Sequence, residues 1–298
     1  MNLKPYYIHY NKPKIARILS NVNTVYTDVD GTLLGPDGSL FNTTKGRPSL
    51  YPAKALVELR QQDIDVIMIS GRSRRQLFGD ARILGLRDYI AELGCQIVHD
   101  LGKKVYVNAP KVKINKGNLH NMIEKSKAPQ LLLDNYKGHL EYHTPWSEGR
   151  ECTHVFRGLI DVNEVNGFLE KNGFDWLQII DNGIIGRRGS LKKDLVEIHA
   201  YHLLPKEAGK DSGLKRDLEL RGSKKSEAIA IGDSFSDLRL ASKVSALFLV
   251  ANAFSEHSDE LYEEMQETEN VFITPLSMNL GFAQVAFELL KARPEIDS

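Results

Sequence analysis

The sequence lacks features that mark several common classes of protein. Its two cysteines, Cys95 and Cys152, are too few for a disulfide framework or for a zinc site with several cysteine ligands, so we predict a reducing, cytoplasmic location. No apolar run reaches the roughly 20 residues that cross a bilayer, and the first residues contain no apolar signal-peptide core. Secretion and membrane insertion are therefore not expected.

The chain also lacks an excess of charge of either sign. It carries 39 Lys and Arg against 39 Asp and Glu in 298 residues. Proteins that bind nucleic acid or anionic membranes usually have a clear basic excess, so we expect neither partner. Two short basic stretches, one with Lys111, Lys113 and Lys116 and one with Lys224 and Lys225, fit solvated faces better than a binding patch.

The length is sufficient for two domains, or for one large domain with an insertion. Four short runs that are apolar at successive positions predict buried strands over residues 25–27, 66–69, 228–231 and 247–250. Strands of this kind are typical of a parallel sheet that is covered on both faces. Helical spacing between them, over residues 53–59 and 238–241, completes the pattern of a doubly wound, mostly parallel, Rossmann-like α/β fold.

The middle of the chain has a different pattern. Polar and apolar residues alternate over residues 139–143, and a helical segment covers residues 162–169. Alternation of this kind suits an antiparallel sheet with one solvated face. We therefore predict an inserted α+β cap domain over residues 108–197. Residues 1–107 and 198–298 would form one core domain, with residues 1–23 as a peripheral N-terminal extension.

Polar residues follow each of the four predicted buried strands. In open α/β sheets, ligands bind just beyond the carboxyl ends of the strands, so we expect these residues at one site. In chain order they are Asp28, Asp30, Gly31 and Thr32; Ser70, Gly71 and Arg72; Asp233 and Asp237; and Asn252. Each motif alone is also a common turn or helix start, but four of them in this order, each after an apolar run, predict a functional site.

The residue types at these positions point to phosphate chemistry with a metal ion. Asp28 and Asp30 would share one face of a continuing strand, and two adjacent carboxylates normally hold a cation or a proton between them. With Asp233 and Asp237 they offer hard oxygen ligands, which favours Mg²⁺ as the cofactor. Exposed amides at the first two strand ends, with Arg72 close by, could hold phosphate oxygens.

These motifs resemble those of the haloacid dehalogenase (HAD) superfamily of phosphatases, across most of the chain. The first motif, Asp-x-Asp-Gly-Thr, matches residues 28–32, and the second, a Ser or Thr that ends a strand, matches Ser70. The fourth, Gly-Asp-x-x-x-Asp, matches residues 232–237, with Ser236 where many relatives have Asn. The long insertion between the second and third motifs resembles the C2-type cap of the Cof-like and sugar-phosphate phosphatase branches.

The third motif of this superfamily is a lysine ahead of a helix. Lys210 is our candidate, because it follows a predicted core strand over residues 196–204 and precedes the helix that leads to the fourth motif. Lys192, Lys193 and Lys215 are competing candidates.

The resemblance implies a mechanism and a set of roles. Asp28 would attack phosphorus to form an aspartyl-phosphate, and Asp30 would act first as general acid and then as general base. Ser70 and Lys210 would complete the catalytic residues, Ser70 by holding phosphate oxygens and Lys210 by neutralising charge. The implied phosphate-binding residues are Gly31, Thr32, Gly71, Arg72 and Asn252. The implied Mg²⁺ ligands are Asp28, Asp30 through its carbonyl, Asp233, and Asp237 through water. The substrate would be a small phosphorylated metabolite, such as a sugar phosphate or a phosphoglycerate conjugate.

Two other functions stay open at this point. A phosphotransferase or phosphomutase of the same superfamily would share the aspartyl-phosphate step, and a non-catalytic phosphosugar-binding regulator would share the fold. Polar residues of the predicted cap could contact a leaving group, but each is more commonly a solvated residue, so none is assigned to the site. These are His143, Glu148, Arg150, His154 and Arg157.

Overall fold

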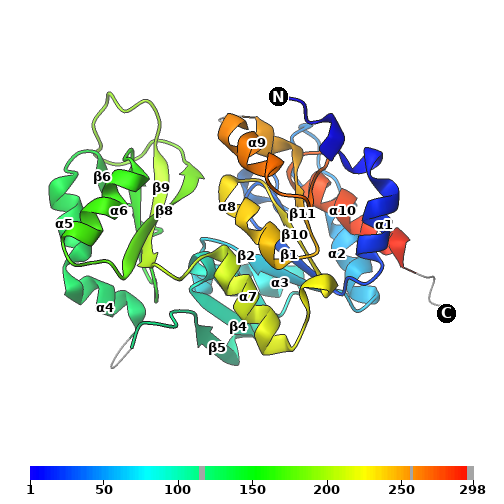
Figure 1. Ribbon diagram of the computed structural model, residues 1–298, viewed down its shortest axis with the longest axis horizontal. Helices are drawn as coiled ribbons and strands as arrows, with labels where there is room; N and C mark the ends of the chain where they lie inside the picture. Colours follow the sequence, from blue (N-terminus) through cyan, green and yellow to red (C-terminus); the bar gives the residue numbers. More distant parts are fainter. Residues whose placement is uncertain (114–117, 256–257, 294–298) are drawn as a thin grey trace. The chain divides into compact units, whose positions relative to one another are not determined.

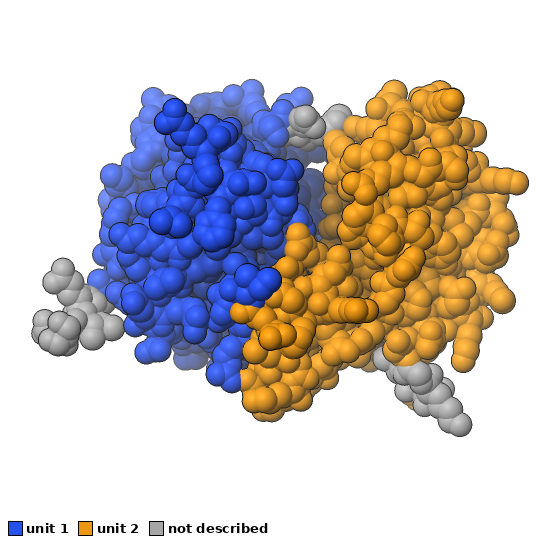
Figure 2. Space-filling model, turned by 180° about the vertical axis from the view of Figure 1, so that it is seen from behind, with its two compact units in different colours: residues 1–70, 83–88, 214–298 blue, residues 71–82, 89–213 orange. Residues whose placement is uncertain are grey.

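The structure is a computed structural model that describes residues 1–113, 118–255 and 258–293. The chain divides into two compact units (Figure 2). Unit 1 comprises residues 1–70, 83–88 and 214–298, and unit 2 comprises residues 71–82 and 89–213. Lys116, which the sequence includes in a basic stretch, lies outside the described residues.

Unit 1 contains a parallel sheet with the strand order β12-β11-β10-β1-β2. Strand β1 (Thr24–Asp28) pairs with β10 (Ala228–Gly232) on one side and with β2 (Asp65–Ile69) on the other, and β11 (Ala246–Leu249) and β12 (Val271–Ile273) extend the sheet. Every residue of β1 and β10 is buried, as expected for inner strands that are covered on both faces. The four predicted buried strands and their parallel pairing are confirmed.

Helices lie on both faces of this sheet. Figure 1 shows α8 and α9 on one side and α1, α2 and α10 on the other, with α10 packed against α1 and α2. Their bounds are α1 Lys12–Leu19, α2 Tyr51–Gln61, α8 Phe235–Leu238, α9 Ser258–Gln266 and α10 Met278–Ala292. The helix predicted over residues 53–59 is confirmed as α2, whereas the one predicted over residues 238–241 is a 3₁₀ turn, Arg239–Lys243, that continues the single turn of α8.

The segment before β1 is part of the packing of unit 1. Ile15 and Leu19 of α1 are 3% and 0% exposed, Val22 is buried, and Tyr7 forms a bridge with Ile273 of β12. The apolar side of α1 therefore adds to the core. This packing differs from the peripheral extension that we predicted for residues 1–23. The sequence did not reveal it, because the few apolar residues of a short amphipathic helix do not specify which element the helix packs against.

A buried polar network holds β1 in place. The Tyr26 hydroxyl donates to Asp217 at 2.7 Å, and burial, followed by the charge of Asp217, raises the pKa of this tyrosine. Arg221 donates to the same carboxylate at 2.7 Å and also pairs with Asp88 and with Asp65. A buried acid that accepts from two neighbouring side chains restricts their positions, so the network helps to hold the strand that ends in Asp28.

The strands of unit 2 pair antiparallel with one another in two groups. Strands β3, β4 and β5 form a meander, and β6, β7, β9 and β8 form a four-stranded sheet in that order. Residues of α4, α5 and α6 pack on the four-stranded sheet in one apolar cluster. The bounds are β3 Tyr89–Ala91, β4 Gln96–His99, β5 Lys104–Val107, α4 Leu119–Ser126, α5 Ala128–Asn135, β6 Leu140–Tyr142, β7 His154–Gly158, α6 Val162–Lys171, β8 Leu177–Ile184 and β9 His199–Pro205. The strand and the helix predicted within residues 139–143 and 162–169 are confirmed. The chain passes between the units at four points, of which two lie within helices, one in α3 (Arg74–Leu84) and one in α7 (Lys210–Arg221).

The strand predicted over residues 196–204 does not belong to the parallel core. It forms β9, which pairs with β7 and β8 in the four-stranded antiparallel sheet, so this prediction was wrong. An inner strand of such a sheet can be buried on both faces. Its sequence is then apolar at successive positions, as in a strand of a parallel sheet. The cap boundaries at residues 108 and 197 stay a prediction, while the compact unit 2 also includes β3, β4, β5 and β9.

The structure also bears on membrane crossing and on the two basic stretches of the sequence. In the described part of the chain, we find no helix with both the length and the apolar character that a membrane crossing requires. Lys111 forms an ion pair with Glu207 at 2.7 Å, and Lys224 and Lys225 are exposed at the surface of unit 1.

Candidate active site

The first motif begins where β1 ends. Asp28 is the last residue of this strand and is 7% exposed, whereas Asp30 is exposed to solvent. The backbone N–H groups of Leu33 and Leu34 donate to the carbonyls of Asp28 and Val29, at 3.2 and 2.8 Å, so the chain folds back at once. The two carboxylates of the motif therefore have different surroundings, one buried at a strand end and one in solvent.

The loop after β1 lies against the loops after β10 and β11. Gly31 has φ +80°, and a Cβ atom there would lie 2.2 Å from Oδ2 of Asp233. The Asp233 carboxylate accepts hydrogen bonds from the Thr32 hydroxyl at 3.2 Å and from the Asn252 amide at 2.9 Å, and that amide also donates to the carbonyl of Gly31 at 3.0 Å. Four predicted site residues thus meet in unit 1, at the carboxyl ends of three neighbouring parallel strands.

We expect the substitution Gly31→Ala to lower the free energy of unfolding by about 1–3 kcal/mol, because φ is left-handed and the new Cβ would overlap the Asp233 carboxylate. Urea denaturation followed by circular dichroism would measure this loss. Gly46→Ala is the matched control, since Gly46 has φ +69° but no atom within 4 Å of the added Cβ. A loss as large in the control would contradict a specific role for close contact with Asp233.

Asp237 organises the loop that carries Asp233. Its carboxylate is fully buried, and one oxygen, Oδ2, accepts from the backbone N–H groups of Asp233 and Ser234, at 3.2 and 3.1 Å, and from the Ser234 hydroxyl at 2.6 Å. These contacts form a capping box at the start of α8. The fourth motif, residues 232–237, is therefore a helix start as well as a candidate site. The capping contacts fix the backbone at Asp233.

The four predicted carboxylates are not assembled as one group of ligands. Across residues 1–113, 118–255 and 258–293, no three side chains of His, Cys, Asp or Glu gather in an arrangement that could hold a metal ion. Asp233 faces Gly31 and Asn252, while Asp237 is directed at its own loop. The arrangement near Asp233 offers oxygen atoms, which suit a hard cation.

The second motif continues from Ser70 in unit 1 to Gly71 in unit 2. Ser70 follows β2 and is 3% exposed. The carbonyl of Gly71 accepts a hydrogen bond from Nη1 of Arg150 at 2.6 Å. A Cβ atom at Gly71 would lie 2.7 Å from Nδ2 of Asn182 and 3.1 Å from Nε2 of His202. Glycine at this position therefore allows close approach, and sequence reasoning missed Asn182 and His202 because neither belongs to a motif.

Arg72 is engaged with the helix that follows it. Its guanidinium pairs with Asp80 of α3, with Nη1 and Oδ2 2.7 Å apart. Ser73 and Gln76 cap the same helix, because the backbone N–H of Ser73 donates to the Gln76 side chain at 2.9 Å and the Ser73 hydroxyl accepts from the backbone N–H of Gln76 at 3.3 Å. The loop after Ser70 is thus held from both sides within unit 2.

Burial separates the four candidate lysines of the third motif. Lys210 is the first residue of α7 and is 6% exposed. Lys192, Lys193 and Lys215 are all exposed; Lys192 contacts His139 and Lys215 faces Glu219 at 3.9 Å. Because lysine is rarely buried without a role for its charge, burial favours Lys210 as the functional residue.

Lys210 belongs to a group of cationic side chains in unit 2. Burial, together with Arg150, His143 and Lys210, lowers the pKa of His202 well below its usual value. Burial and nearby arginines, Arg157 first among them, lower the pKa of His143 to about 4. Both histidines are therefore neutral at pH 7, and the positive charge around them suits an anion.

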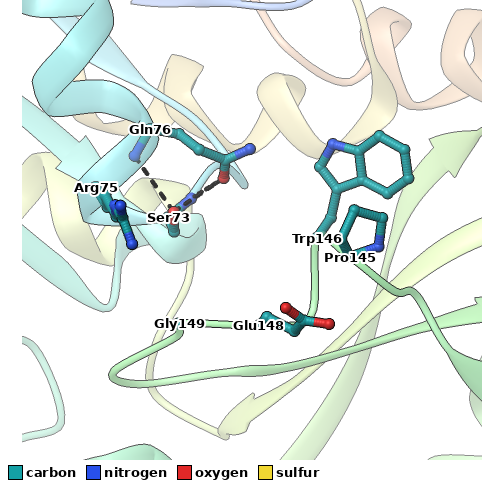
Figure 3. Close-up of a pocket in the computed structure, with 7 residues that line it drawn as sticks. All are labelled: Ser73, Arg75, Gln76, Pro145, Trp146, Glu148 and Gly149. Atoms are coloured by element: carbon teal, nitrogen blue, oxygen red, sulfur yellow. Dashed lines mark hydrogen bonds between the residues drawn. The ribbon is translucent and has the colours of Figure 1, made fainter.

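A cavity of about 390 Å³ lies beside the start of α3 in unit 2. Figure 3 shows the Gln76 side chain on one side and the Trp146 indole on the other, with Glu148 below. Its walls are formed by Ser73, Arg75, Gln76, Pro145, Trp146, Glu148 and Gly149. His143 stacks on Trp146 with ring centroids 4.8 Å apart. The cavity combines an aromatic face with amide, guanidinium and carboxylate groups.

The other polar residues noted in the predicted cap have different places. Arg150 is 7% exposed and contacts Gly71, as described above. His154 is 1% exposed and stacks on His120, with ring centroids 3.8 Å apart, and Arg157 pairs with Glu141 at 2.6 Å. Among those five residues, only Glu148 lines the cavity.

The chain is similar in sequence to known proteins. Residues 25–260 match the family described as haloacid dehalogenase-like hydrolase. The chain is 28% identical over 241 residues to phosphoglycolate phosphatase 1 of Saccharolobus solfataricus, covering 80% of this chain and 86% of the relative. It is 25% identical over 236 residues to a phosphoglycolate phosphatase of Methanococcoides burtonii, covering 79% and 86%.

The fold is also found among solved structures. The sucrose-phosphatase of Synechocystis, solved with sucrose and phosphate, is similar with a TM-score of 0.62 and 14% identity, over 90% of this chain and 98% of that one. At this identity the likeness shows the fold alone. The match to the family covers more than three quarters of the chain, and the resemblance seen in the motifs is confirmed. The chain therefore belongs to the haloacid dehalogenase-like hydrolases, as an enzyme of the phosphatase type.

Proposed function

We propose that this enzyme hydrolyses the phosphate monoester of a small metabolite through an aspartyl-phosphate on Asp28, with Mg²⁺ as cofactor. The observation that carries the proposal is the buried Asp28 at the end of β1, followed by the contact of Gly31 with Asp233 and Asn252. The curated relatives named phosphoglycolate phosphatase support a small phosphorylated substrate.

The carboxylate and carbonyl oxygens of these residues fit a magnesium ion. Asp28 and Asp233 would hold it through their carboxylates and Asp30 through its backbone carbonyl, with Asp237 acting through water. This set needs only two direct side-chain ligands, so it does not depend on a cluster of three acids. The closeness of Gly31 to Asp233 supports it, because a Cβ atom would fill the space beside Oδ2. When bound, Mg²⁺ would offset negative charge at the transferring phosphoryl group.

The chemistry would proceed in two half-reactions. In the first, a carboxylate oxygen of Asp28 bonds to phosphorus while the ester P–O bond breaks, and Asp30 gives its proton to the departing oxygen. In the second, Asp30 takes a proton from water, the water oxygen bonds to phosphorus, and the bond to Asp28 breaks to release inorganic phosphate. The exposed position of Asp30 supports its role, since a group that loses and regains a proton needs access to water.

Phosphate oxygens would be held by Ser70, by the amides around Gly31 and Gly71, and by the ammonium of Lys210. For Arg72 we propose a contribution through its backbone, because its guanidinium is paired with Asp80. Positive charge at Lys210 would offset the repulsion between an anionic phosphate and a carboxylate nucleophile.

The leaving group would occupy the cavity between Gln76 and Trp146. Its volume of about 390 Å³ admits a small metabolite, and its lining of amide, guanidinium, carboxylate and aromatic groups suits a hydroxylated or carboxylated molecule. Ser73, which lines the cavity, is three positions after Ser70 in the chain. A sugar phosphate and a phosphorylated hydroxy acid are the two substrate classes to compare.

The test is a screen for phosphate release from a panel of phosphorylated metabolites, with Mg²⁺ and with EDTA, using Asp28→Asn as the blank. We expect Mg²⁺-dependent release of inorganic phosphate from sugar phosphates or from phosphorylated hydroxy acids. Transfer of phosphate to a second metabolite, without release, would instead indicate a phosphotransferase or phosphomutase. Thermal stabilisation by a panel member without turnover would indicate a binding protein.

A further inference from the structure

We infer that Arg150 is a positioning residue, which orients the Gly71–Arg72 peptide so that its N–H group can bind the substrate phosphate. This inference rests on the proposed function, because it assumes that the loop after Ser70 binds phosphate. Arg150 belongs to no motif and lies about 80 residues after the loop in the chain, at the end of the segment that leads to β7.

Arg150 is almost fully buried and its guanidinium is shared between backbone carbonyls. Nη1 donates to the carbonyl of Gly71 at 2.6 Å, and Nε donates to the carbonyl of Trp146 at 2.9 Å. Nη1 also lies 3.4 Å from the hydroxyl of Thr153. With 7% of the residue exposed, these contacts replace water around a charge whose burial is costly. Burial also lowers the pKa of Arg150, although the charge of Glu92 opposes this.

The contact with Gly71 determines which way the next amide points. In a trans peptide, the carbonyl of one residue and the N–H of the next lie in one plane and point in opposite directions. Holding the Gly71 carbonyl therefore directs the N–H of Arg72 away from Arg150. A cation bonded to the carbonyl also polarises the peptide, which makes that N–H a stronger donor to an anion.

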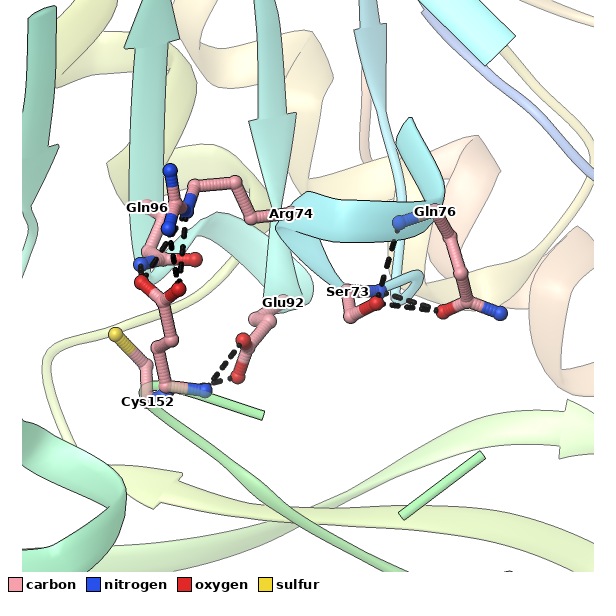
Figure 4. A network of polar contacts seen from close by, with 7 residues as sticks. Ser73, Arg74, Gln76, Glu92, Gln96 and Cys152 are labelled. Atoms are coloured by element: carbon pink, nitrogen blue, oxygen red, sulfur yellow. Dashed lines mark hydrogen bonds and ion pairs between the residues drawn. The ribbon is translucent and has the colours of Figure 1, made fainter. Parts of the chain in front are cut away.

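A second buried side chain, Glu92, holds the segment that follows Arg150. The Glu92 carboxylate is 0% exposed and accepts from the backbone N–H groups of Glu151, Cys152 and Thr153, at 2.9, 3.1 and 2.7 Å, and from the Thr153 hydroxyl at 2.8 Å. Figure 4 shows this carboxylate directed at the segment that contains Cys152. The residues that follow Arg150 are thereby fixed to the turn between β3 and β4.

The same turn holds the loop directly. The backbone N–H of Glu92 donates to the carbonyl of Arg72 at 3.0 Å. Glu92 has φ +51° and Leu93 has φ +53°, a strained conformation that persists only where surrounding contacts hold it. The carbonyls of two successive loop residues, Gly71 and Arg72, are thus bound by Arg150 and Glu92. Both carbonyls of this stretch are therefore held by donors of unit 2.

The test compares Arg150→Met with the wild type in steady-state hydrolysis and in inhibition by inorganic phosphate. A misdirected amide weakens binding of ester and phosphate alike, so we expect KM and the phosphate inhibition constant to rise together by about tenfold, while kcat changes less than about threefold. A structural defect would lower the active fraction, which lowers the apparent kcat and leaves KM unchanged. That second pattern would overturn the inference.

Two further variants make the comparison decisive. Arg150→Lys keeps the positive charge. KM should rise by about threefold, because an ammonium lacks the planar fork through which Nη1 and Nε bond the carbonyls of Gly71 and Trp146. Arg74→Gln is the control: Arg74 pairs with Glu151 in the same network but contacts neither loop carbonyl, so KM should be unchanged. An equal rise in KM for Arg74→Gln, or none for Arg150→Lys, would contradict the positioning role.

Calorimetric titration with inorganic phosphate separates this inference from the proposed function. If the wild type hydrolyses no ester but binds phosphate, the proposed function fails, and weaker binding by Arg150→Met would still support the positioning role. If the wild type hydrolyses esters and Arg150→Met binds phosphate equally well, only the inference fails. A wild type that neither hydrolyses esters nor binds phosphate would overturn both.

Discussion

Asp28→Asn should reduce phosphate release by about 10⁴-fold or more, because an amide oxygen does not form the aspartyl-phosphate that the two half-reactions require. Asn has almost the same shape as Asp, so the buried end of β1 should keep its packing, and the melting temperature should stay within a few degrees. Turnover of the best substrate from the panel, in the presence of Mg²⁺, measures the first effect, and circular dichroism measures the second.

The control for this variant is Asp37→Asn. Asp37 lies nine positions later, is exposed, and has φ +60°, a conformation that asparagine also adopts readily. The same chemical change should therefore leave both activity and stability unaltered. Substantial Mg²⁺-dependent release of phosphate by Asp28→Asn would remove Asp28 from the role of nucleophile, whatever the control does.

Much of the core could be predicted because its strands are buried on both faces. Four apolar runs identified β1, β2, β10 and β11, and the polar residues that follow them were expected to meet at one edge of the sheet. Within unit 1, Gly31, Thr32, Asp233 and Asn252 do meet, since the register of parallel strands leaves little freedom at their carboxyl ends. Local sequence patterns and the order of the strands are sufficient to predict which residues meet at a site of this kind.

The features of the fold and of the site that could not be predicted depend on contacts between segments that are distant in sequence, and no local pattern specifies such contacts. Strand β9 was assigned to the core because an inner antiparallel strand and a parallel strand have the same apolar pattern. The contact of Arg150 with Gly71 joins residues 79 positions apart, and a lone arginine in sequence gives no sign of its partner. The fourth motif was also compatible with a helix start, but the sequence did not identify Asp237 as the side chain that accepts from the backbone there.

The lysine of the third motif is a question that the sequence leaves open and on which burial gives an independent argument. Four lysines fit the spacing, and the argument for Lys210 relied partly on a core strand that proved to be β9. Burial supplies an independent reason, because Lys210 is 6% exposed while Lys192, Lys193 and Lys215 are exposed. Lys210 therefore stays our candidate, although the strand over residues 196–204 does not belong to the parallel core.

Lys210→Met should lower kcat/KM by about 10²–10³-fold, because the variant loses a charge that would stabilise the phosphoryl group as it is transferred. Methionine retains the apolar stem in a buried place and removes one of several neighbouring positive charges. The melting temperature, followed by circular dichroism, shows whether the variant stays folded under the assay conditions, so that a loss of activity in the folded variant would not reflect unfolding.

Lys215→Met is the matched control for that measurement. Lys215 lies on the same helix, five positions later, is exposed, and faces Glu219 at 3.9 Å, a distance at which a surface pair contributes little. Its kcat/KM should stay within about twofold of the wild type. If Lys215→Met lost more activity than Lys210→Met, the assignment of the third motif would move to Lys215; if neither lost activity, Lys192 and Lys193 would be tested in the same way. A loss confined to Lys210→Met, with the fold retained, would tie the buried ammonium at the start of α7 to the transfer of phosphate.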